Sequence, residues 1–335
     1  GGSYFTFATE NNYTIWTFLK EVWKRGWLYK GHDVMPWCPR CETGISQHEI
    51  VTDGYAELTH DAPVIRFPLR PSSLSGKGAG GEREALLVWT TTPWTLTSNV
   101  AAAVGPELTY VKVRAQDGWT YYLAEGTLST IVKGKYEVLG RLKGAEMVGW
   151  EYDGPFDELP AVQAMNVPAF HRVIPWDAVG EVEGTGIVHI APGCGAEDFA
   201  LGKEFELPAL APLTEDGVFL EGFDWLTGRH VHEVAHEIFH DLEDKGLLYR
   251  VDAYTHRYPV CWRCATPLVF RLVDEWFINM GELYDKPREE VTAEEKARSL
   301  RYQIMDVVDQ IQWIPEFGYA REMDWLHNMR DWMIS

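Results

Sequence analysis

Short apolar runs separated by polar turns occupy the middle of the chain and predict a β-rich region. We expect strands over 62–69, 86–89, 110–114, 119–124, 136–139, 161–165 and 186–190. Helical spacing is rarer in this region and predicts helices over 125–132, 196–205 and 231–245. This combination is typical of a barrel-like domain that carries a few helices.

Helical periodicity returns near both ends of the chain. A helix is expected over 13–27, where Ile15, Phe18, Leu19 and Val22 share one face. After a strand over 268–272, two amphipathic helices are expected over 293–310 and 316–329. The pattern therefore predicts an α+β fold with a β-rich, barrel-like domain at 61–250. We expect it to be inserted between a connective region at 1–60 and a helical return at 251–335.

Composition limits the classes of protein that fit this pattern. At 335 residues the chain is long enough for two or three domains, and no apolar run reaches about 18 residues, so no membrane span is expected. The net charge of −20 argues against a large nucleic-acid surface but leaves room for a pocket that takes one nucleotide end. We recognise no secretory leader, and the first three residues and the last one suggest an excised fragment.

Four of the five cysteines form two C-x-x-C pairs, which fit a reduced, cytoplasmic environment better than a disulfide framework. The pairs are Cys38 with Cys41 and Cys261 with Cys264, and 219 residues separate them. Four thiolates match a closed structural zinc site, so we predict one shared Zn²⁺ in a zinc ribbon split by an insertion. The alternative is two unrelated thiol pairs.

The sequence LLVWTTTPWTLTSN at 86–99 begins as a buried strand and runs into Thr90, Thr91 and Thr92. Threonine is a good strand residue, so the run has an ordinary structural interpretation. Pro93 stops the strand at once, however, and Trp89 and Trp94 flank the run. Hydroxyls and backbone N–H groups gathered in this way can orient a water molecule or hold a carbonyl oxygen.

A second stretch, EGTGIVHIAPGCGAEDF at 183–199, predicts a strand, a turn and the start of a helix. The turn can bring His189 and Asp198 to the same end of a sheet. Asp198 would lie in the first helical turn, where a carboxylate is favoured without any functional role, and His189 could equally be an ordinary core residue. Alternatively, Asp198 could pair with a substrate ammonium group.

Two other motifs suggest chemistry less strongly. His232, Glu233 and His236 fit H-E-x-x-H, a pattern found in zinc hydrolases. Apolar residues already define the buried face of the expected helix, and His236 and Glu233 would then point to solvent. The glycine-rich run at 71–82 follows no strand-to-helix turn, so we interpret it as a surface hairpin.

Three motifs together resemble those of isoleucyl-tRNA synthetases. The sequence VWTTTPWTL at 88–96 resembles the threonine-rich peptide of that family, and GTGIVH with the following APGCGAED resembles its second editing motif. The sequence YTHRYPVCWRC at 254–264 resembles its distal zinc knuckle. Valyl and leucyl relatives would carry Thr-Thr-Arg-Pro at the first motif. Departures are modest and include Met333 and the histidine-rich segment at 230–240.

The resemblance implies an editing (CP1) domain set in a zinc-bearing connective region. It implies hydrolysis of Val-tRNA(Ile), with Asp198 pairing with the valyl ammonium and His189 bordering the side-chain pocket. Thr90, Thr91 and Thr92 would hold the terminal adenosine and place the attacking water. The walls of the substrate site would come from Trp89, Trp94, Gly186 and Ala196.

The resemblance also limits what the piece is expected to do. It lacks the ATP-binding signatures of the family, so we expect no activation of isoleucine by this chain alone. Its expected partners are the 3′ end of tRNA(Ile) carrying valine and the rest of the synthetase catalytic core, and we expect a monomer. A connective or tRNA-end-binding module without turnover is the second hypothesis, and an H-E-x-x-H zinc hydrolase is the third.

Overall fold

The computed structural model describes residues 5–46, 49–50, 54–71 and 83–334. They form two compact units, one from Val34–Leu272 and the other from Gly1–Asp33 with Val273–Ser335. The boundaries fall within two strands, β1 (Leu28–Cys38) and β12 (Val269–Ile278). The predicted division at residues 60 and 250 stays a prediction.

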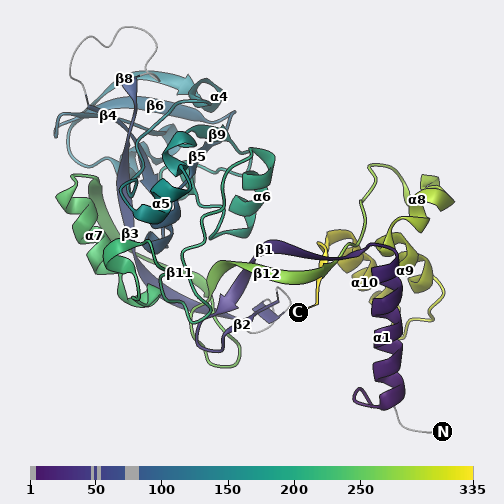
Figure 1. The fold of residues 1–335 in the computed structure, drawn as a ribbon. Helices are drawn as coiled ribbons and strands as arrows, with labels where there is room; N and C mark the ends of the chain where they lie inside the picture. Colours follow the sequence, from purple (N-terminus) through teal and green to yellow (C-terminus); the bar gives the residue numbers. More distant parts are fainter. Residues whose placement is uncertain (1–4, 47–48, 51–53, 72–82, 335) are drawn as a thin grey trace. The chain divides into compact units, whose positions relative to one another are not determined.

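A six-stranded sheet forms the main scaffold of the larger unit, in the order β11-β3-β4-β7-β6-β8. Neighbouring strands are antiparallel except for β4 and β7, which are parallel. Strands β3 and β11 run side by side over eleven paired positions (Figure 1). The strands are β3 (Tyr55–Pro68), β4 (Arg83–Trp89), β6 (Thr109–Ala115), β7 (Trp119–Ala124), β8 (Tyr136–Lys143) and β11 (Leu248–Pro259).

One face of this sheet carries a fully buried apolar cluster. Val64 on β3, Leu87 on β4, Val113 on β6 and Tyr121 on β7 all have no exposed surface. β-branched and aromatic side chains pack well on a pleated sheet, which explains why these apolar runs become strands. The end of β4 is thereby fixed at Trp89, where the threonine run begins.

A smaller three-stranded sheet has the order β10-β5-β9, from β5 (Ala101–Val104), β9 (Val173–Pro175) and β10 (Ile187–Ile190). His189 on β10 pairs with Ala102 on β5. The helical segments of this unit are η2 (Pro93–Ser98), η3 (Glu125–Thr127), α3 (Leu128–Ile131), α4 (Gly144–Met147), α5 (Pro160–Ala164), η4 (Val167–Ala169), α6 (Ala196–Glu204), η5 (Asp224–Leu226), η6 (Val231–Glu233) and α7 (Ala235–Asp244).

The fold is α+β as predicted, but the expected barrel is wrong. The part of the chain that the structure describes forms three separate sheets, and none of them closes. The large sheet ends at β11 on one side and at β8 on the other. The polar and apolar pattern of each strand reports which faces are buried, and it does not encode whether the first and last strands meet.

Several local predictions also fail. Residues 161–165 were expected in a strand, but Pro160 begins helix α5 there, at a position where its missing N–H costs nothing. The helix expected over 231–245 is divided into η6 and α7 at Val234. Residues 72–82 of the predicted surface hairpin lie outside the described residues.

The smaller unit contains α1 (Thr9–Lys24), η7 (Arg288–Glu290), α8 (Ala293–Ala297), α9 (Leu300–Val308) and α10 (Phe317–Asn328). A short strand, β13 (Trp332–Met333), pairs with β12. The single helix predicted over 293–310 is therefore two helices. Ser299 separates them, because its hydroxyl accepts a hydrogen bond from the Tyr302 N–H and so starts α9 as its N-cap.

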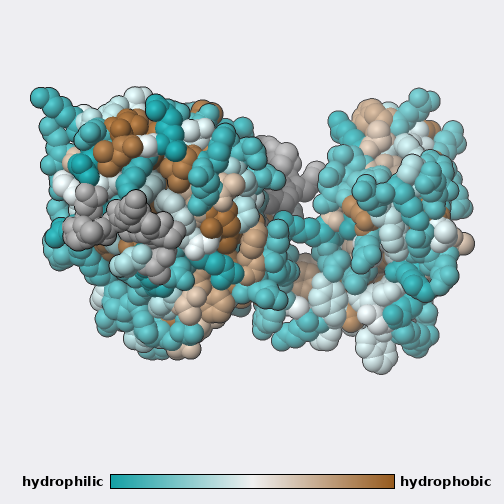
Figure 2. Space-filling view, turned by 90° about the horizontal axis from the view of Figure 1, so that it is seen from above, coloured by the Kyte–Doolittle hydropathy of each residue, from teal (hydrophilic) through white to brown (hydrophobic). Residues whose placement is uncertain are grey.

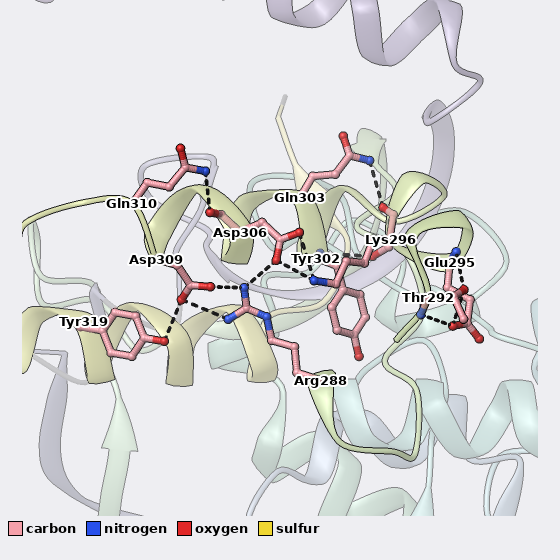
Figure 3. Close-up of polar contacts among 11 residues, drawn as sticks. Arg288, Thr292, Glu295, Lys296, Tyr302, Gln303, Asp306, Asp309, Gln310 and Tyr319 are labelled. Carbon is pink, nitrogen blue, oxygen red and sulfur yellow. Dashed lines mark hydrogen bonds and ion pairs between the residues drawn. The ribbon is translucent and has the colours of Figure 1, made fainter. Parts of the chain in front are cut away.

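Ion pairs hold α9 to the segments around it. Figure 3 shows the Arg288 guanidinium between two carboxylates, bonded to Asp306 at 2.7 Å and to Asp309 at 2.6 Å. Lys296 on α8 also donates to Asp306, at 2.9 Å, and the Tyr319 hydroxyl on α10 donates to Asp309, also at 2.9 Å.

Hydrophilic residues cover most of the visible face of each unit (Figure 2), in keeping with the high charge of the chain.

The hydroxyl of Tyr110 on β6 links the end of β5 to the start of β10. It donates to the Gly186 carbonyl at 2.7 Å and accepts from the Gly105 N–H at 3.0 Å, and its side chain is fully buried.

We expect Tyr110→Phe to lower the free energy of unfolding by about 1–3 kcal/mol, because two buried polar groups lose their partner. Urea denaturation followed by circular dichroism measures this, and Tyr136→Phe on the exposed side of β8 should cost less than about 0.5 kcal/mol. Equal effects of the two changes would contradict the assignment.

Candidate active site

A cavity of about 640 Å³ in the larger unit brings the two conspicuous sequence stretches together. Its walls come from the threonine run, the loop before β10, β10 itself and the start of α6. Of the predicted site residues, those that line it are Trp89, Thr90, Thr91, Thr92, Trp94, Gly186, His189 and Asp198. Ala196 begins α6 and is not among the residues that line this cavity.

The threonine run leaves the strand, so the interpretation that it merely extends β4 is wrong. β4 ends at Trp89, and the Thr90 hydroxyl accepts a hydrogen bond from the Thr92 N–H at 3.0 Å. Pro93 then starts the 3₁₀ helix η2. The result is a tight turn in which Thr90 is buried, while Thr91 and Thr92 remain half-buried beside the cavity.

His189 is held by Thr95, a residue to which the sequence assigned no role. The Thr95 hydroxyl donates to the Thr92 carbonyl at 2.7 Å, so it can only accept from His189 Nε2, which lies 3.0 Å away. This fixes the neutral tautomer with the proton on Nε2. Burial lowers the pKa of His189 to about 4, so the imidazole stays neutral near pH 7. The spacing of Thr92 and Thr95 along a helical turn was the available signal, but only the fold brings β10 next to it.

Asp198 lies in the first turn of α6, whose N-cap is Gly195. One carboxylate oxygen accepts the Ala191 N–H at 2.8 Å. A Cβ at Gly195 would come within 2.9 Å of the Asp198 carboxyl carbon, so glycine is required for this approach. Burial raises the pKa of Asp198 to about 7, and the bond from Ala191 opposes the rise only in part.

Glycines shape the loop that faces the threonine run. Gly184 and Gly186 have φ of +66° and +70°, in the left-handed region. A Cβ at Gly184 would lie 2.7 Å from the Trp89 ring, and one at Gly186 would lie 2.3 Å from the Ala124 Cβ. Only glycine lets the loop approach these neighbours so closely, whereas the role of Gly186 in a substrate wall stays a prediction.

The H-E-x-x-H motif does not form a metal site. His232 and Glu233 belong to η6, whereas His236 belongs to α7, so the residues do not share one helix. Within 5–46, 49–50, 54–71 and 83–334, the only group of three or more potential metal ligands consists of four cysteines. The hypothesis of a zinc hydrolase at the histidines is therefore wrong.

The four cysteines converge as predicted, which excludes two unrelated thiol pairs. The Sγ atoms of Cys38, Cys41, Cys261 and Cys264 all lie within 4.8 Å of one another. Cys264 Sγ is 3.5 Å from Cys38 Sγ and 3.6 Å from Cys41 Sγ. In a tetrahedral site with Zn–S bonds of about 2.3 Å, sulfur atoms are about 3.8 Å apart. The cluster can hold a metal ion such as zinc.

The chain belongs to the class I tRNA synthetases, because residues 2–335 match the model for "tRNA synthetases class I (I, L, M and V)". It is 36% identical over 334 residues to the isoleucine–tRNA ligase of Methanothermobacter marburgensis, and 36% identical over 341 residues to that of Methanopyrus kandleri. Each alignment covers 99% of this chain, but only 28% and 30% of the two relatives. The chain therefore spans less than a third of their length.

Two solved structures resemble the chain more weakly. The structure described as GlLeuRS-CP1 has a TM-score of 0.46 and 12% identity, covering 56% of this chain and 96% of that one. The P. knowlesi cytosolic leucyl-tRNA synthetase editing domain has a TM-score of 0.35 and 15% identity, covering 46% of this chain and 65% of that one. Both scores are below 0.5, so the family assignment rests on sequence. Among the helices that the structure describes, none combines the length and the hydropathy that a bilayer-spanning segment needs.

The raised pKa of Asp198 has a cost in stability that a substitution can reveal. Unfolding returns the carboxyl to an ordinary pKa of 3.8, so the native state loses stability as the pH rises from about 4 through about 7. We expect Asp198→Asn to raise the free energy of unfolding by about 1–3 kcal/mol at pH 8, and by much less at pH 4. Urea denaturation at the two pH values measures the difference.

Glu204 at the other end of α6 provides a matched control. Its side chain is exposed and its charge does not contribute to the raised pKa of Asp198, so Glu204→Gln should change stability little at either pH. A stabilisation by Asp198→Asn that is equal at pH 4 and pH 8 would show that the carboxyl titrates normally in the folded chain.

Proposed function

We propose that this cavity hydrolyses valine from mischarged Val-tRNA(Ile), as an editing site within an isoleucyl-tRNA synthetase. The observation that carries the proposal is the position of the Asp198 carboxylate in one cavity with the threonine run and His189. The similarity to isoleucine–tRNA ligases supports the choice of tRNA. The activation of isoleucine with ATP belongs to the rest of that larger protein.

Asp198 would bind the α-ammonium group of the valyl ester. The carboxylate keeps lone pairs free beyond the one that accepts from Ala191, and it lies in a cavity that weakens competition from water. A bound ammonium group favours the ionised carboxylate and would draw the pKa of Asp198 back down. Substrate binding would thus supply the counter-charge that the cavity lacks.

Valine would be distinguished from isoleucine by size. A synthetic site that fits isoleucine also accepts valine, because one methylene is worth only about 1–3 kcal/mol of discrimination. A second site can exclude the larger side chain with a rigid wall. His189 is suited to this role, since it is buried, neutral and held by Thr95.

Direct attack by water fits the groups that line the cavity. The hydroxyls of Thr91 and Thr92 lie 3.5 Å apart and can orient a water molecule toward the ester carbonyl. The water oxygen bonds to the carbonyl carbon, the ester C–O bond breaks, and the ribose oxygen leaves with a proton, giving free valine and uncharged tRNA. A ribose hydroxyl can assist, and no covalent enzyme intermediate is needed.

We also propose that the four cysteines bind one structural Zn²⁺, which takes no part in hydrolysis. The ligand set is complete with four thiolates, so no coordination position is left for a substrate or water. The ion would tie the hairpin of β1 and β2 (Thr43–Gly44) to the segment after β11. The tRNA end carrying valine and the rest of the synthetase are the expected partners, and we expect a cytoplasmic monomer.

We expect Asp198→Ala to lower the rate of Val-tRNA(Ile) deacylation by the 335-residue chain about a hundredfold or more, because the ammonium group loses its charged partner. Release of radiolabelled valine measures the rate. For the unchanged chain, the rate should rise with pH from 5 to 7 as Asp198 ionises. Glu204→Gln on the same helix is the charge-matched control and should leave the rate unchanged.

Undiminished deacylation by Asp198→Ala would refute the role given to this carboxylate. If the unchanged chain binds the tRNA end without turnover, the alternative of a non-catalytic connective module is correct instead.

Metal analysis tests the zinc proposal. We expect about one Zn²⁺ per chain, and we expect Cys38→Ser or Cys261→Ser to lose the metal and destabilise the larger unit, because one missing thiolate opens a closed site. Cys194→Ser changes the fifth cysteine, which lines the main cavity instead, and should retain full zinc content. Zinc retained at full content by both Cys38→Ser and Cys261→Ser would refute the proposed ligands.

A further inference from the structure

A second cavity, of about 210 Å³, adjoins the main one. Four residues line both cavities, namely Trp89, Val182, Glu183 and Gly184. The second cavity is completed by the segment around α3 and by three residues of β11, which are Arg250, Asp252 and Tyr254. A chain-like ligand that fills the main cavity therefore has an adjacent place for its next unit. At about 30 Å³ per water molecule, this cavity could hold roughly seven water molecules, which leaves enough room for one base.

Aromatic rings form part of this second cavity. The Trp89 and Tyr254 rings lie 5.1 Å apart with their planes almost perpendicular, at 89°. Gly184 packs against Trp89 so closely that a side chain there would displace the indole. Val182, at the rim of both cavities, is 93% exposed. Half-buried aromatic rings beside an exposed apolar side chain are typical of surfaces on which an unstacked base packs.

The charged groups that line the cavity are Arg250 and two carboxylates, those of Glu183 and Asp252. Arg250 donates to Asp252 at 2.7 Å and to two backbone carbonyls, those of Ile131 and Thr130. A guanidinium group has five N–H donors, so these three bonds hold it rigidly and leave two donors over. Glu183 accepts from the Tyr254 hydroxyl, which raises the pKa of Tyr254 and leaves other lone pairs of the carboxylate available.

We propose that this cavity binds the cytosine base that precedes the terminal adenosine of tRNA. The proposal rests on the proposed function, which puts that adenosine and its valyl ester in the main cavity. Cytosine carries an amino donor beside ring and carbonyl acceptors, and carboxylates are the usual partners of that amino group. Glu183 accepts from the amino group, and the spare N–H groups of Arg250 donate to the acceptors.

The same groups discriminate against other bases. Uracil has a carbonyl oxygen where cytosine has the amino group, and this oxygen would face the Glu183 carboxylate. A phosphate is also disfavoured, because Glu183 and Asp252 contribute two negative charges against the single positive charge of Arg250. The cavity thus fits the edge of a base and not the sugar-phosphate backbone of the tRNA end.

Binding of unreactive mimics of the tRNA end tests the proposal. The first probe is adenosine with valine joined through a 3′ amide, and the other two add one cytidylate or one uridylate before the adenosine. Calorimetric titration of the 335-residue chain gives the dissociation constants. We expect the cytidylate probe to bind about tenfold more tightly than the uridylate probe.

Glu183→Gln should remove this preference, because an amide offers both an acceptor for cytosine and a donor for uracil. The readout is the ratio of the two affinities, so a general loss of binding does not mimic the result. Glu181→Gln makes the same charge change two residues away, on a side chain that does not line the cavity, and should keep the ratio.

Equal affinities of the cytidylate and uridylate probes for the unchanged chain would overturn the proposal. If the valyl-adenosine probe still binds in that case, the proposed function stands. If none of the three probes binds, both the cytosine site and the proposed function are wrong.

Discussion

The Thr95 hydroxyl makes the interaction that joins the two halves of the candidate site. It donates to the carbonyl of Thr92 and accepts from His189, so a single oxygen atom links the turn after β4 to strand β10. The turn itself contains few backbone bonds, and the Thr90 hydroxyl supplies one of its partners. Without this pair of side-chain bonds, neither the orientation of the imidazole nor the place of the threonines would be fixed. The site is therefore organised by hydroxyl groups before any substrate enters.

The electrostatics of the cavity follow from the same burial. Of the titratable groups that line the cavity, His189 and Asp198 are both driven toward their neutral forms, with the pKa of the first lowered and that of the second raised. A cationic ligand that enters the cavity would favour the ionised form of Asp198, and the two charges would then form an ion pair away from bulk water. The strongly acidic surface of the chain has no direct part in this, since exposed charges are screened within about 10 Å.

The sequence was most informative where chemistry restricts residue type. The paired cysteines predicted one cluster, and the structure brings all four together across 219 intervening residues. The threonine run, His189 and Asp198 were predicted to share a pocket, and they line one cavity, although their roles remain predictions. Ala196 was included only because it is part of a motif, and its side chain has no place in the lining.

The failed predictions have two physical causes, because some depend on contacts between distant segments and others on a local signal that the apolar pattern outweighed. Strand periodicity predicted most of the strands of the larger unit but not that its sheets stay open. The run Ala161 to Met165 is apolar enough for a strand, yet Pro160 pre-forms a helical start. Thr95 was missed because its partner His189 is 94 positions away and is brought near only by the pairing of β10 with β5.

Closing the cysteine cluster also has a consequence for how the chain tolerates changes in length. The entropy lost on joining two points of a flexible chain grows only with the logarithm of the segment between them, so doubling that segment adds only about 0.6 kcal/mol. The 219 residues between Cys41 and Cys261 already separate the two cysteine pairs by a long segment of chain. Insertions or deletions inside it would hardly alter the free energy of closing the cluster. The segment between the two cysteine pairs can therefore gain or lose residues while the two pairs still meet in one cluster.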